Sequence, residues 1–205
     1  SDSSVYPPMS TFLKSLDIPV YEGFSEDNLK RPIPDLVVIG NVLSRGNAEV
    51  EYVLNQDLRY RSMAETLKEF FIRGRRSTVV SGTHGKTTTT AMLVWMLSAA
   101  GREPSFLLGG IAENFQSSFQ IGGGPDFVVE GDEYDTAFFD KGPKFLHYLP
   151  RIAIVKNIEF DHADIYPDLE AIKLSFRRFV NIVPGDGLLI AGVDSPAVQE
   201  LLVNA

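Results

Sequence analysis

A glycine-containing turn at residues 82–88 carries the strongest chemical signal in the sequence. An apolar run at 77–81 precedes it, and an apolar segment with helical spacing begins at Lys86. In such a strand–turn–helix unit, backbone N–H groups and the helix N-terminus attract phosphate, Lys86 can reach the outer phosphates of a nucleotide, and Thr87 can bind Mg²⁺. The usual phosphate-loop spacing would require glycine where Val80 stands. The turn therefore predicts a shortened phosphate cradle, and a plain turn with an incidental lysine is the alternative.

Two further segments place polar side chains just after apolar runs. Glu130 follows the run 127–129 and lies in an acidic stretch, and His162 follows the run 152–155 and lies between aspartates. The carboxyl ends of parallel strands meet at one edge of a sheet, where ligands bind, and a carboxylate there can hold Mg²⁺ against phosphates. Taken singly, Glu130 could belong to a solvated acidic loop, and His162 could be a metal ligand, a base or a capped loop histidine. Together with the turn, they predict one crevice for a nucleotide.

These polar segments need a scaffold that brings the ends of separate strands together. Apolar residues at successive positions predict strands covered on both faces, as in a mostly parallel sheet flanked by helices. In the helix predicted at 63–72, the apolar residues Ala64, Leu67, Phe70 and Phe71 stand at helical spacing. The sequence is thus predicted to fold as an α/β protein. The apolar runs lie at 36–40, 77–81, 106–108, 127–129, 152–155 and 188–190, and helical spacing occurs at 63–72, 86–100 and 169–183.

The composition excludes several classes of partner. Lys and Arg number 19 against 27 Asp and Glu, so the net charge is −8, and no basic surface is expected for nucleic acid or an anionic membrane. The chain has no cysteine, which excludes disulfides and thiolate chemistry and fits a reducing compartment. The longest strongly apolar stretch, 91–100, is half of the about 20 residues that a membrane span requires. We therefore expect a cytoplasmic protein with neither a nucleic-acid nor a membrane partner.

Three motifs stand in chain order: Gly82-Thr83-His84-Gly85-Lys86-Thr87-Thr88, Glu130-Gly131-Asp132-Glu133-Tyr134-Asp135 and Asn157-Ile158-Glu159-Phe160-Asp161-His162-Ala163-Asp164. They resemble the signatures of the Mur ligases, which are ATP-dependent amide-forming enzymes of peptidoglycan metabolism. The resemblance covers nearly the whole chain. It implies part of an N-terminal, Rossmann-like UDP-sugar-binding domain with its linker at 1–74, and part of a central P-loop ATP-binding domain at 75–205. It also implies that further segments of both domains and a C-terminal domain are missing, so these 205 residues are expected to be inactive alone.

Within the family, the run 130–141 is similar to the branch that joins UDP-N-acetylmuramate to the tripeptide L-alanyl-γ-D-glutamyl-meso-diaminopimelate in murein recycling. This resemblance implies a reaction through an acyl phosphate that uses ATP and Mg²⁺. The branch that adds L-alanine to UDP-N-acetylmuramate usually has serine in place of Tyr134 and methionine in place of Ala163, so we favour the tripeptide branch. The phosphate loop by itself would also fit a related folate ligase, or a nucleotide-binding module without ligase activity.

The resemblance also implies a role for individual motif residues. Lys86, Glu130 and His162 are expected to be catalytic, and Thr87, Glu130 and His162 are expected to bind Mg²⁺. Some family members carry a carbamylated lysine, but Arg177 stands at that position here, so none is assigned. The residues expected to contact the nucleotide are Gly82, Thr83, His84, Gly85, Lys86, Thr87, Thr88 and Asn157.

Overall fold

The computed structural model describes residues 1–7, 9–161 and 165–203, and these residues form two compact units. The first unit comprises Ser1–Met63 with Ala137–Phe139, and the second comprises Ala64–Thr136 with Asp140–Ala205. Residues 64–74 belong to the second unit, because Ala64 and Ile72 are buried in its core. The predicted domain bounds, 1–74 and 75–205, stay a prediction.

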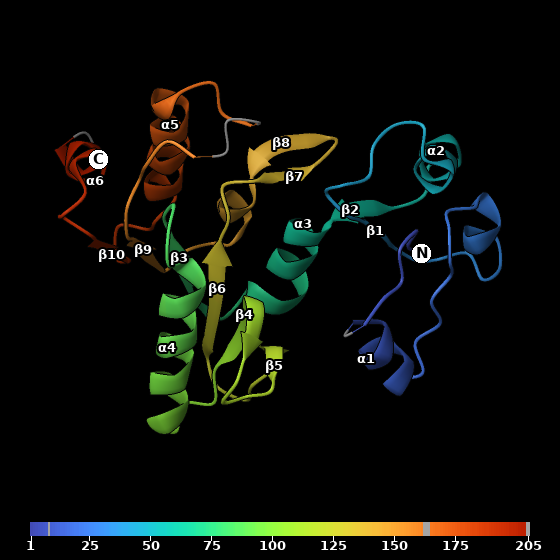
Figure 1. Ribbon diagram of the computed structural model, residues 1–205, viewed down its shortest axis with the longest axis horizontal. Helices are drawn as coiled ribbons and strands as arrows, with labels where there is room; N and C mark the ends of the chain where they lie inside the picture. The colour runs from blue at the N-terminus through green and yellow to red at the C-terminus, as the bar shows by residue number, and fades with distance from the viewer. Residues whose placement is uncertain (8, 162–164, 204–205) are drawn as a thin grey trace. The chain divides into compact units, whose positions relative to one another are not determined.

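The first unit contains a parallel pair of strands and short helices, coloured blue to teal in Figure 1. The side chain of Asn47 caps α2 by accepting hydrogen bonds from backbone N–H groups of the first helical turn. Val50 and Val53 of α2 then pack with Ile39 of β1, and Phe138 packs against this cluster. The elements of the unit are α1 (Met9–Ser15), a 3₁₀ turn (Glu26–Leu29), β1 (Val37–Ile39), α2 (Ala48–Asn55) and β2 (Tyr60–Ser62).

The second unit is built, within the described residues, on a six-stranded sheet in the order β10-β9-β3-β6-β4-β5. Neighbouring strands are parallel except for β4 and β5, which are antiparallel. The strands are β3 (Arg76–Ser81), β4 (Ser105–Ala112), β5 (Ser117–Gln120), β6 (Asp126–Gly131), β9 (Ile152–Val155) and β10 (Leu188–Ala191), while β7 (Asp135–Ala137) pairs with β8 (Asp140–Pro143). The helical elements are α3 (Met63–Leu67), a π turn (Lys68–Ile72), α4 (Lys86–Ala99), a 3₁₀ turn (Lys144–His147), α5 (Leu169–Asn181) and α6 (Pro196–Val203).

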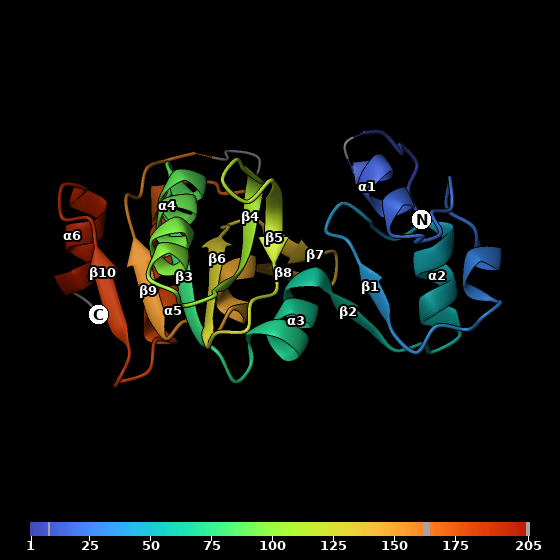
Figure 2. The same ribbon diagram turned by 90° about the horizontal axis from the view of Figure 1, so that it is seen from below.

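The two faces of this sheet bury different side chains of the same strand. Val128 of β6 packs with Val94 of α4 and Phe106 of β4. Its neighbours Phe127 and Val129 belong instead to the cluster that α5 covers. Successive side chains of a strand point to opposite faces, so an unbroken apolar run suits a sheet covered on both sides. Helix α4 lies over one face and α5 over the other (Figure 2), which confirms the predicted α/β class with a mostly parallel sheet flanked by helices.

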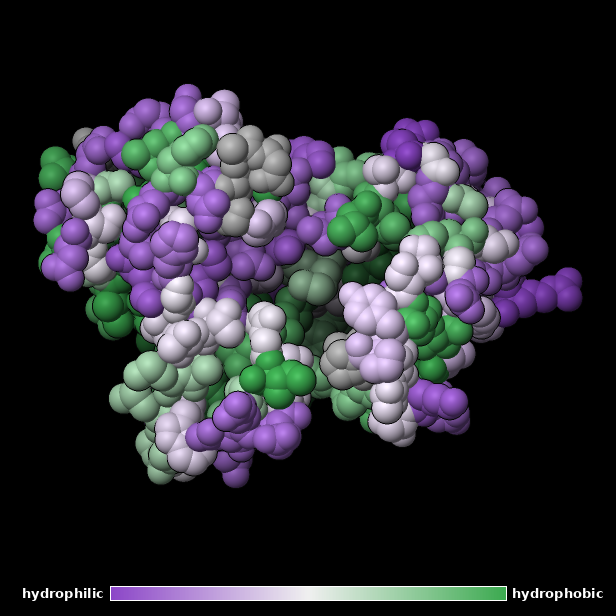
Figure 3. Space-filling model, viewed as in Figure 1, coloured by the Kyte–Doolittle hydropathy of each residue, from purple (hydrophilic) through white to green (hydrophobic). Residues whose placement is uncertain are grey.

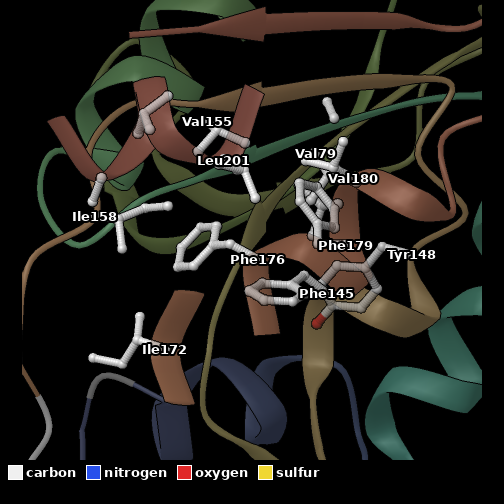
Figure 4. Packing of buried hydrophobic residues seen from close by; sticks show 14 of the residues in the cluster. Val79, Phe145, Tyr148, Val155, Ile158, Ile172, Phe176, Phe179, Val180 and Leu201 are labelled. Carbon is white, nitrogen blue, oxygen red and sulfur yellow. The ribbon is translucent and has the colours of Figure 1, made fainter. Parts of the chain in front are cut away.

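The larger core cluster contains phenylalanine rings from α5 and from the 3₁₀ turn Lys144–His147. The ring centroid of Phe145 lies 5.4 Å from that of Phe176 and 4.8 Å from that of Phe179, and all three side chains are fully buried (Figure 4). The side chain of Asp168 caps α5 by accepting a hydrogen bond of 2.9 Å from the backbone N–H of Ala171. Each buried ring contributes about 1.5–3 kcal/mol to folding.

The helix predicted at 63–72 is interrupted, and not all of its apolar residues at helical spacing face the core. After α3 the chain passes into a π turn, in which an N–H bonds to the carbonyl five rather than four residues back, so the following side chains are rotated. Ala64 is buried. Phe70 is 65% exposed and Phe71 is 39% exposed, and Ile72 takes the inward position with 1% exposure.

Two apolar surfaces of the second unit face outward. Edge strand β10 exposes Leu188 and Ile190, because α4 packs over β3, β4 and β6 and does not cover it. The prediction that each apolar run is covered on both faces was therefore wrong for this strand. Helix α4 itself exposes Met92, Trp95 and Met96, and the surface over it is pale green to white in Figure 3. Within the described ranges, no helix is both long and apolar enough to cross a bilayer.

Gly131, at the end of β6, allows the strands beneath the candidate site to pack closely. A Cβ there would lie 2.8 Å from Cγ1 of Val79 and 3.2 Å from the Cβ atoms of Phe145 and Ser81. We expect Gly131→Ala to lower the free energy of unfolding by about 1–3 kcal/mol, because the added methyl overpacks the core. Chemical denaturation measures this change. Gly185→Ala is the control, since its Cβ would meet nothing within 4 Å, and equal stability of the two variants would contradict the close packing.

Candidate functional site

The candidate site lies at the carboxyl edge of the central strands. Strand β3 lies between β6 and β9, and Ser81 at its end is level with Gly131 on one side and Val155 on the other. From β3 the chain passes through α4 to β4, beyond β6, and returns later to β9 on the opposite side of β3. The direction of strand addition therefore reverses at β3. Ligands of open α/β sheets bind at such switch points, outside the carboxyl ends of the strands.

The loop from β3 to α4 has a backbone shape that requires glycine. Gly82 has φ +134° and Gly85 has φ +76°, which are conformations that residues with a Cβ rarely adopt. A Cβ on Gly82 would also lie 3.1 Å from backbone and side-chain atoms of Asn157. Gly85 is the N-cap residue of α4 and has no side chain with which to cap it. The N–H groups and the positive dipole end of α4 therefore suit an incoming anion such as phosphate.

The segment that follows β9 holds the loop from one side. The backbone N–H of Thr83 donates to the carbonyl oxygen of Asn157 at 3.0 Å, and the backbone N–H of His84 donates to Oδ1 of Asn157 at 2.9 Å. Nζ of Lys156 donates to the carbonyl oxygen of Gly85 at 3.1 Å. Asn157 thus fixes the loop through both its backbone and its side chain. Its predicted contact with the nucleotide stays a prediction.

We expect Asn157→Ala to weaken the binding of MgATP to the whole protein by about fivefold. The variant removes the acceptor for the N–H of His84, and one lost hydrogen bond of this kind corresponds to about 1 kcal/mol. Calorimetric titration with MgATP measures the change. Asn114→Ala, in the loop between β4 and β5, is the matched control and is expected to bind as the wild type does. Unchanged affinity in Asn157→Ala would show that the side chain does not order the loop for phosphate.

The side chains of Thr87 and Glu130 meet beside this loop. Oγ1 of Thr87 donates to Oε2 of Glu130 at 2.8 Å, and the backbone N–H of Gly109 donates to Oε1 of Glu130 at 2.6 Å. Within the described residues there is no group of three acidic, histidine or cysteine side chains that could hold a metal. Mg²⁺ takes oxygen ligands and typically few of them from protein when phosphates supply the rest. A hydroxyl and a carboxylate side by side therefore fit Mg²⁺ bound with a nucleotide.

Lys86 is held by a partner that the sequence analysis did not single out. Its Nζ donates to the carbonyl oxygen of Gly82 at 2.8 Å and lies 3.1 Å from Oε2 of Glu133. The side chain of Lys86 is 13% exposed and that of Glu133 only 3%. Tyr166 donates its hydroxyl to the carbonyl oxygen of Glu133 at 2.7 Å. Burial raises the pKa of Tyr166, and the charges of Glu133 and Asp135 add to this rise, so the phenol stays protonated as a donor.

The other predicted site residues either have exposed side chains or lie outside the described residues. His162 lies outside the described residues, so its predicted roles as a catalytic residue and metal ligand stay predictions. Thr88 is exposed in the first turn of α4, and the ring of His84 is exposed beside Glu159, with 3.7 Å between Nε2 and Oε2. The predicted residues that the structure gathers around the loop are Gly82, Thr83, Gly85, Lys86, Thr87, Glu130 and Asn157.

Two family descriptions match the chain. The Mur ligase middle domain matches residues 80–205, and the catalytic domain of the Mur ligase family matches residues 1–75. A Haemophilus influenzae protein named UDP-N-acetylmuramate--L-alanyl-gamma-D-glutamyl-meso-2,6-diaminoheptandioate ligase is 48% identical over 98% of this chain and 44% of its own length. The Escherichia coli protein of the same name is 50% identical over 93% of this chain and 41% of its own length.

A solved structure is also similar to this chain. The crystal structure of UDP-N-acetylmuramate:L-alanyl-gamma-D-glutamyl-meso-diaminopimelate ligase from Neisseria meningitides superposes with a TM-score of 0.94 at 46% identity, covering 100% of this chain and 66% of that one. The chain therefore spans less than half the length of the two curated relatives, at 44% and 41%, and about two thirds of the solved structure.

Proposed function

This chain belongs to the Mur ligase family, and from this premise we propose that the whole protein is an ATP-dependent ligase. It joins UDP-N-acetylmuramate to the tripeptide L-alanyl-γ-D-glutamyl-meso-diaminopimelate by forming an amide bond. The observation that carries the proposal is the cluster at the start of α4, where Lys86, Thr87 and Glu130 lie beside a glycine loop at a sheet switch point. Identity of 48% and 50% to two relatives that carry this ligase name supports the choice of substrates.

Electrostatic repulsion between the reactants opposes the reaction, and the site is suited to reduce this repulsion. A muramyl carboxylate oxygen attacks the γ-phosphorus of ATP, the bond from that phosphorus to the β,γ-bridging oxygen breaks, and ADP leaves an acyl phosphate behind. The amine of the peptide then attacks the acyl carbon, phosphate departs with the C–O electron pair, and the amine loses a proton. Because an anionic carboxylate and a polyphosphate repel each other, catalysis depends on fixed positive charge and on alignment.

The residues of this chain would divide these tasks. The N–H groups at the start of α4 would bind phosphate oxygens, and Lys86 would neutralise charge on the outer phosphates. Thr87 and Glu130 would hold Mg²⁺ through their oxygens, which lie 2.8 Å apart. When bound, Mg²⁺ supplies positive charge to the phosphate oxygens and helps to align them. Asn157 would keep the loop in shape through its bonds to Thr83 and His84.

The test is release of ADP and phosphate by the whole protein from ATP. We expect turnover to require UDP-N-acetylmuramate and the tripeptide together. Turnover with L-alanine in place of the tripeptide would instead support the sister branch of the family, and turnover with a folate substrate would support the folate ligase. Binding of ATP without turnover under all of these conditions would support a nucleotide-binding module. Since ATP and nucleotide sugars are metabolites of the cytoplasm, the proposal implies that the reaction takes place there.

A further inference from the structure

Two carboxylates stand at the carboxyl end of β6, Glu130 within the strand and Glu133 just after it, and each contacts a different residue at the start of α4. Glu130 accepts from Thr87 at 2.8 Å, and Glu133 faces Lys86 with distances of 3.3 and 3.1 Å from Nζ to its two carboxylate oxygens. The proposed function uses Thr87, Glu130 and Lys86. It leaves Glu133 without a role, although this side chain is the more buried member of its ion pair.

The pair of Lys86 and Glu133 turns the ammonium group toward the protein. Beyond Glu133, Nζ also donates to the carbonyl oxygens of Gly82 at 2.8 Å and Thr83 at 3.4 Å. An ammonium group has only three N–H donors, all of which have acceptors here. To bind a phosphate oxygen, Lys86 therefore has to give up or share a bond that it makes within the protein.

The backbone of Glu133 is held in place by a hydrogen bond from Tyr166. Tyr166, whose side chain is largely buried, donates its hydroxyl to the carbonyl oxygen of Glu133 at 2.7 Å. The neighbouring Asp132 differs, since its side chain is 37% exposed and its carboxylate lies 3.8 Å from Nζ of Lys144. Two adjacent acids of equal charge thus have different partners, and only Glu133 is placed to act on Lys86.

A buried negative charge at this position opposes a phosphate ligand in two ways. It competes with phosphate oxygens for the ammonium of Lys86, and it repels their negative charge in a region screened poorly by water. An enzyme that forms ADP on each turnover must also release it, and release is often the slow step of such cycles. A charge that weakens the hold of the loop on phosphates would favour that release.

We propose that Glu133 is a positioning residue that restrains Lys86 in the nucleotide-free loop and thereby weakens nucleotide binding. The inference rests on the proposed role of the loop in binding nucleotide. It does not depend on which acid or amine the protein joins. Glu133 acts through Lys86, so its effect on nucleotide affinity disappears when the ammonium group is absent.

The experiment is a double-mutant cycle on the whole protein, with MgADP as the probe and calorimetric titration as the measurement. Glu133→Gln, which keeps the shape and removes the charge, is expected to bind MgADP about fivefold more tightly, or tighter still, than wild type. In a Lys86→Met background the same change is expected to alter affinity by less than about twofold. Asp132→Asn is the matched control for the loss of one charge nearby and is expected to stay within about twofold of wild type. Glu133→Asp keeps the charge but draws the carboxylate back from Lys86 by one CH₂, so its affinity is expected to lie between those of wild type and Glu133→Gln.

Each other outcome overturns the inference. Unchanged affinity in Glu133→Gln would show that the carboxylate does not restrain Lys86, and weaker binding would show that it assists the nucleotide. An equal change in both backgrounds, or an equal change in Asp132→Asn, would indicate a general effect of charge or folding, and thermal denaturation of each variant identifies the latter. The cycle needs neither the sugar nucleotide nor the tripeptide, so it can succeed even if the ligase substrates are wrong, and it can fail when they are right.

Discussion

A Lys86→Met variant of the whole protein is expected to form ADP about 10³-fold more slowly than wild type, or slower still. Lys86 is the cation placed at the first position of α4, next to the glycine that opens the helix. Methionine fills nearly the same space but cannot neutralise charge that develops on the transferred phosphate. A loss of this size corresponds to about 4 kcal/mol of transition-state stabilisation. The measurement is the steady-state rate of ADP formation at saturating concentrations of all substrates.

The control for this variant is the other lysine at the same loop. Nζ of Lys156 donates to the carbonyl oxygen of Gly85 at 3.1 Å, so Lys156→Met removes a positive charge and a loop contact and is expected to slow the reaction by less than about tenfold. Because Lys86→Met leaves the buried carboxylate of Glu133 without this partner, its folding is checked by thermal denaturation. Lys86→Arg keeps the charge and serves as a second variant. Equal rates for Lys86→Met and Lys156→Met in folded proteins would remove Lys86 from the mechanism.

The sheet beneath the site could be predicted because each of its central strands contains apolar residues at successive positions. The runs at 77–81, 127–129 and 152–155 became β3, β6 and β9 with bounds that differ by at most two residues. Strands β5 and β7 could not be found in this way. Ser117–Gln120 and Asp135–Ala137 are short and mostly polar, and their pairing depends on neighbours rather than on their own pattern.

Phe70 and Phe71 show where helical spacing misleads. Their positions fit an α-helix with Ala64 inside, but one π turn rotates both rings outward and brings Ile72 into the core. The apolar spacing of a single sequence gives no signal for such a turn, which becomes visible only in the structure, where Ile72 joins the core cluster. Amphipathic spacing therefore identified the helix and its start correctly and failed only after the geometry of the helix changed.

Residues of the site could be predicted where a chemical pattern ties them to a strand end. Glu130 follows its apolar run directly, and its contact with Thr87 fits the expected pair of oxygen donors. Glu133 stands in the same acidic stretch, and nothing in the sequence distinguishes it from Asp132. Only the fold buries the first and exposes the second. The donation from Gly109 to Glu130 was also beyond prediction, because it depends on where β4 lies beside β6.

Glu130→Gln is expected to slow ADP formation by about 10²-fold or more and to weaken the apparent affinity for Mg²⁺ by about tenfold or more. Both carboxylate oxygens of Glu130 accept hydrogen bonds, from Thr87 and from Gly109. Glutamine has one acceptor oxygen and an NH₂ group, so either Thr87 or Gly109 would face another donor. The side chain would also lose the negative charge that attracts a metal ion. The measurement is the rate of ADP formation as a function of Mg²⁺ concentration.

The dependence on Mg²⁺ separates a metal-binding role from a structural one. If Glu130 holds the metal, a higher concentration of Mg²⁺ restores part of the rate of Glu130→Gln, because mass action compensates for a weaker site. The same addition leaves Lys86→Met slow, since its missing charge belongs to the protein. Glu113→Gln, at an exposed position after β4, is the control and should follow the wild-type curve. A Glu130→Gln variant that is slow at every Mg²⁺ concentration, with an unchanged midpoint, would assign Glu130 to the support of Thr87 and the β4 backbone and would leave the metal to other oxygens.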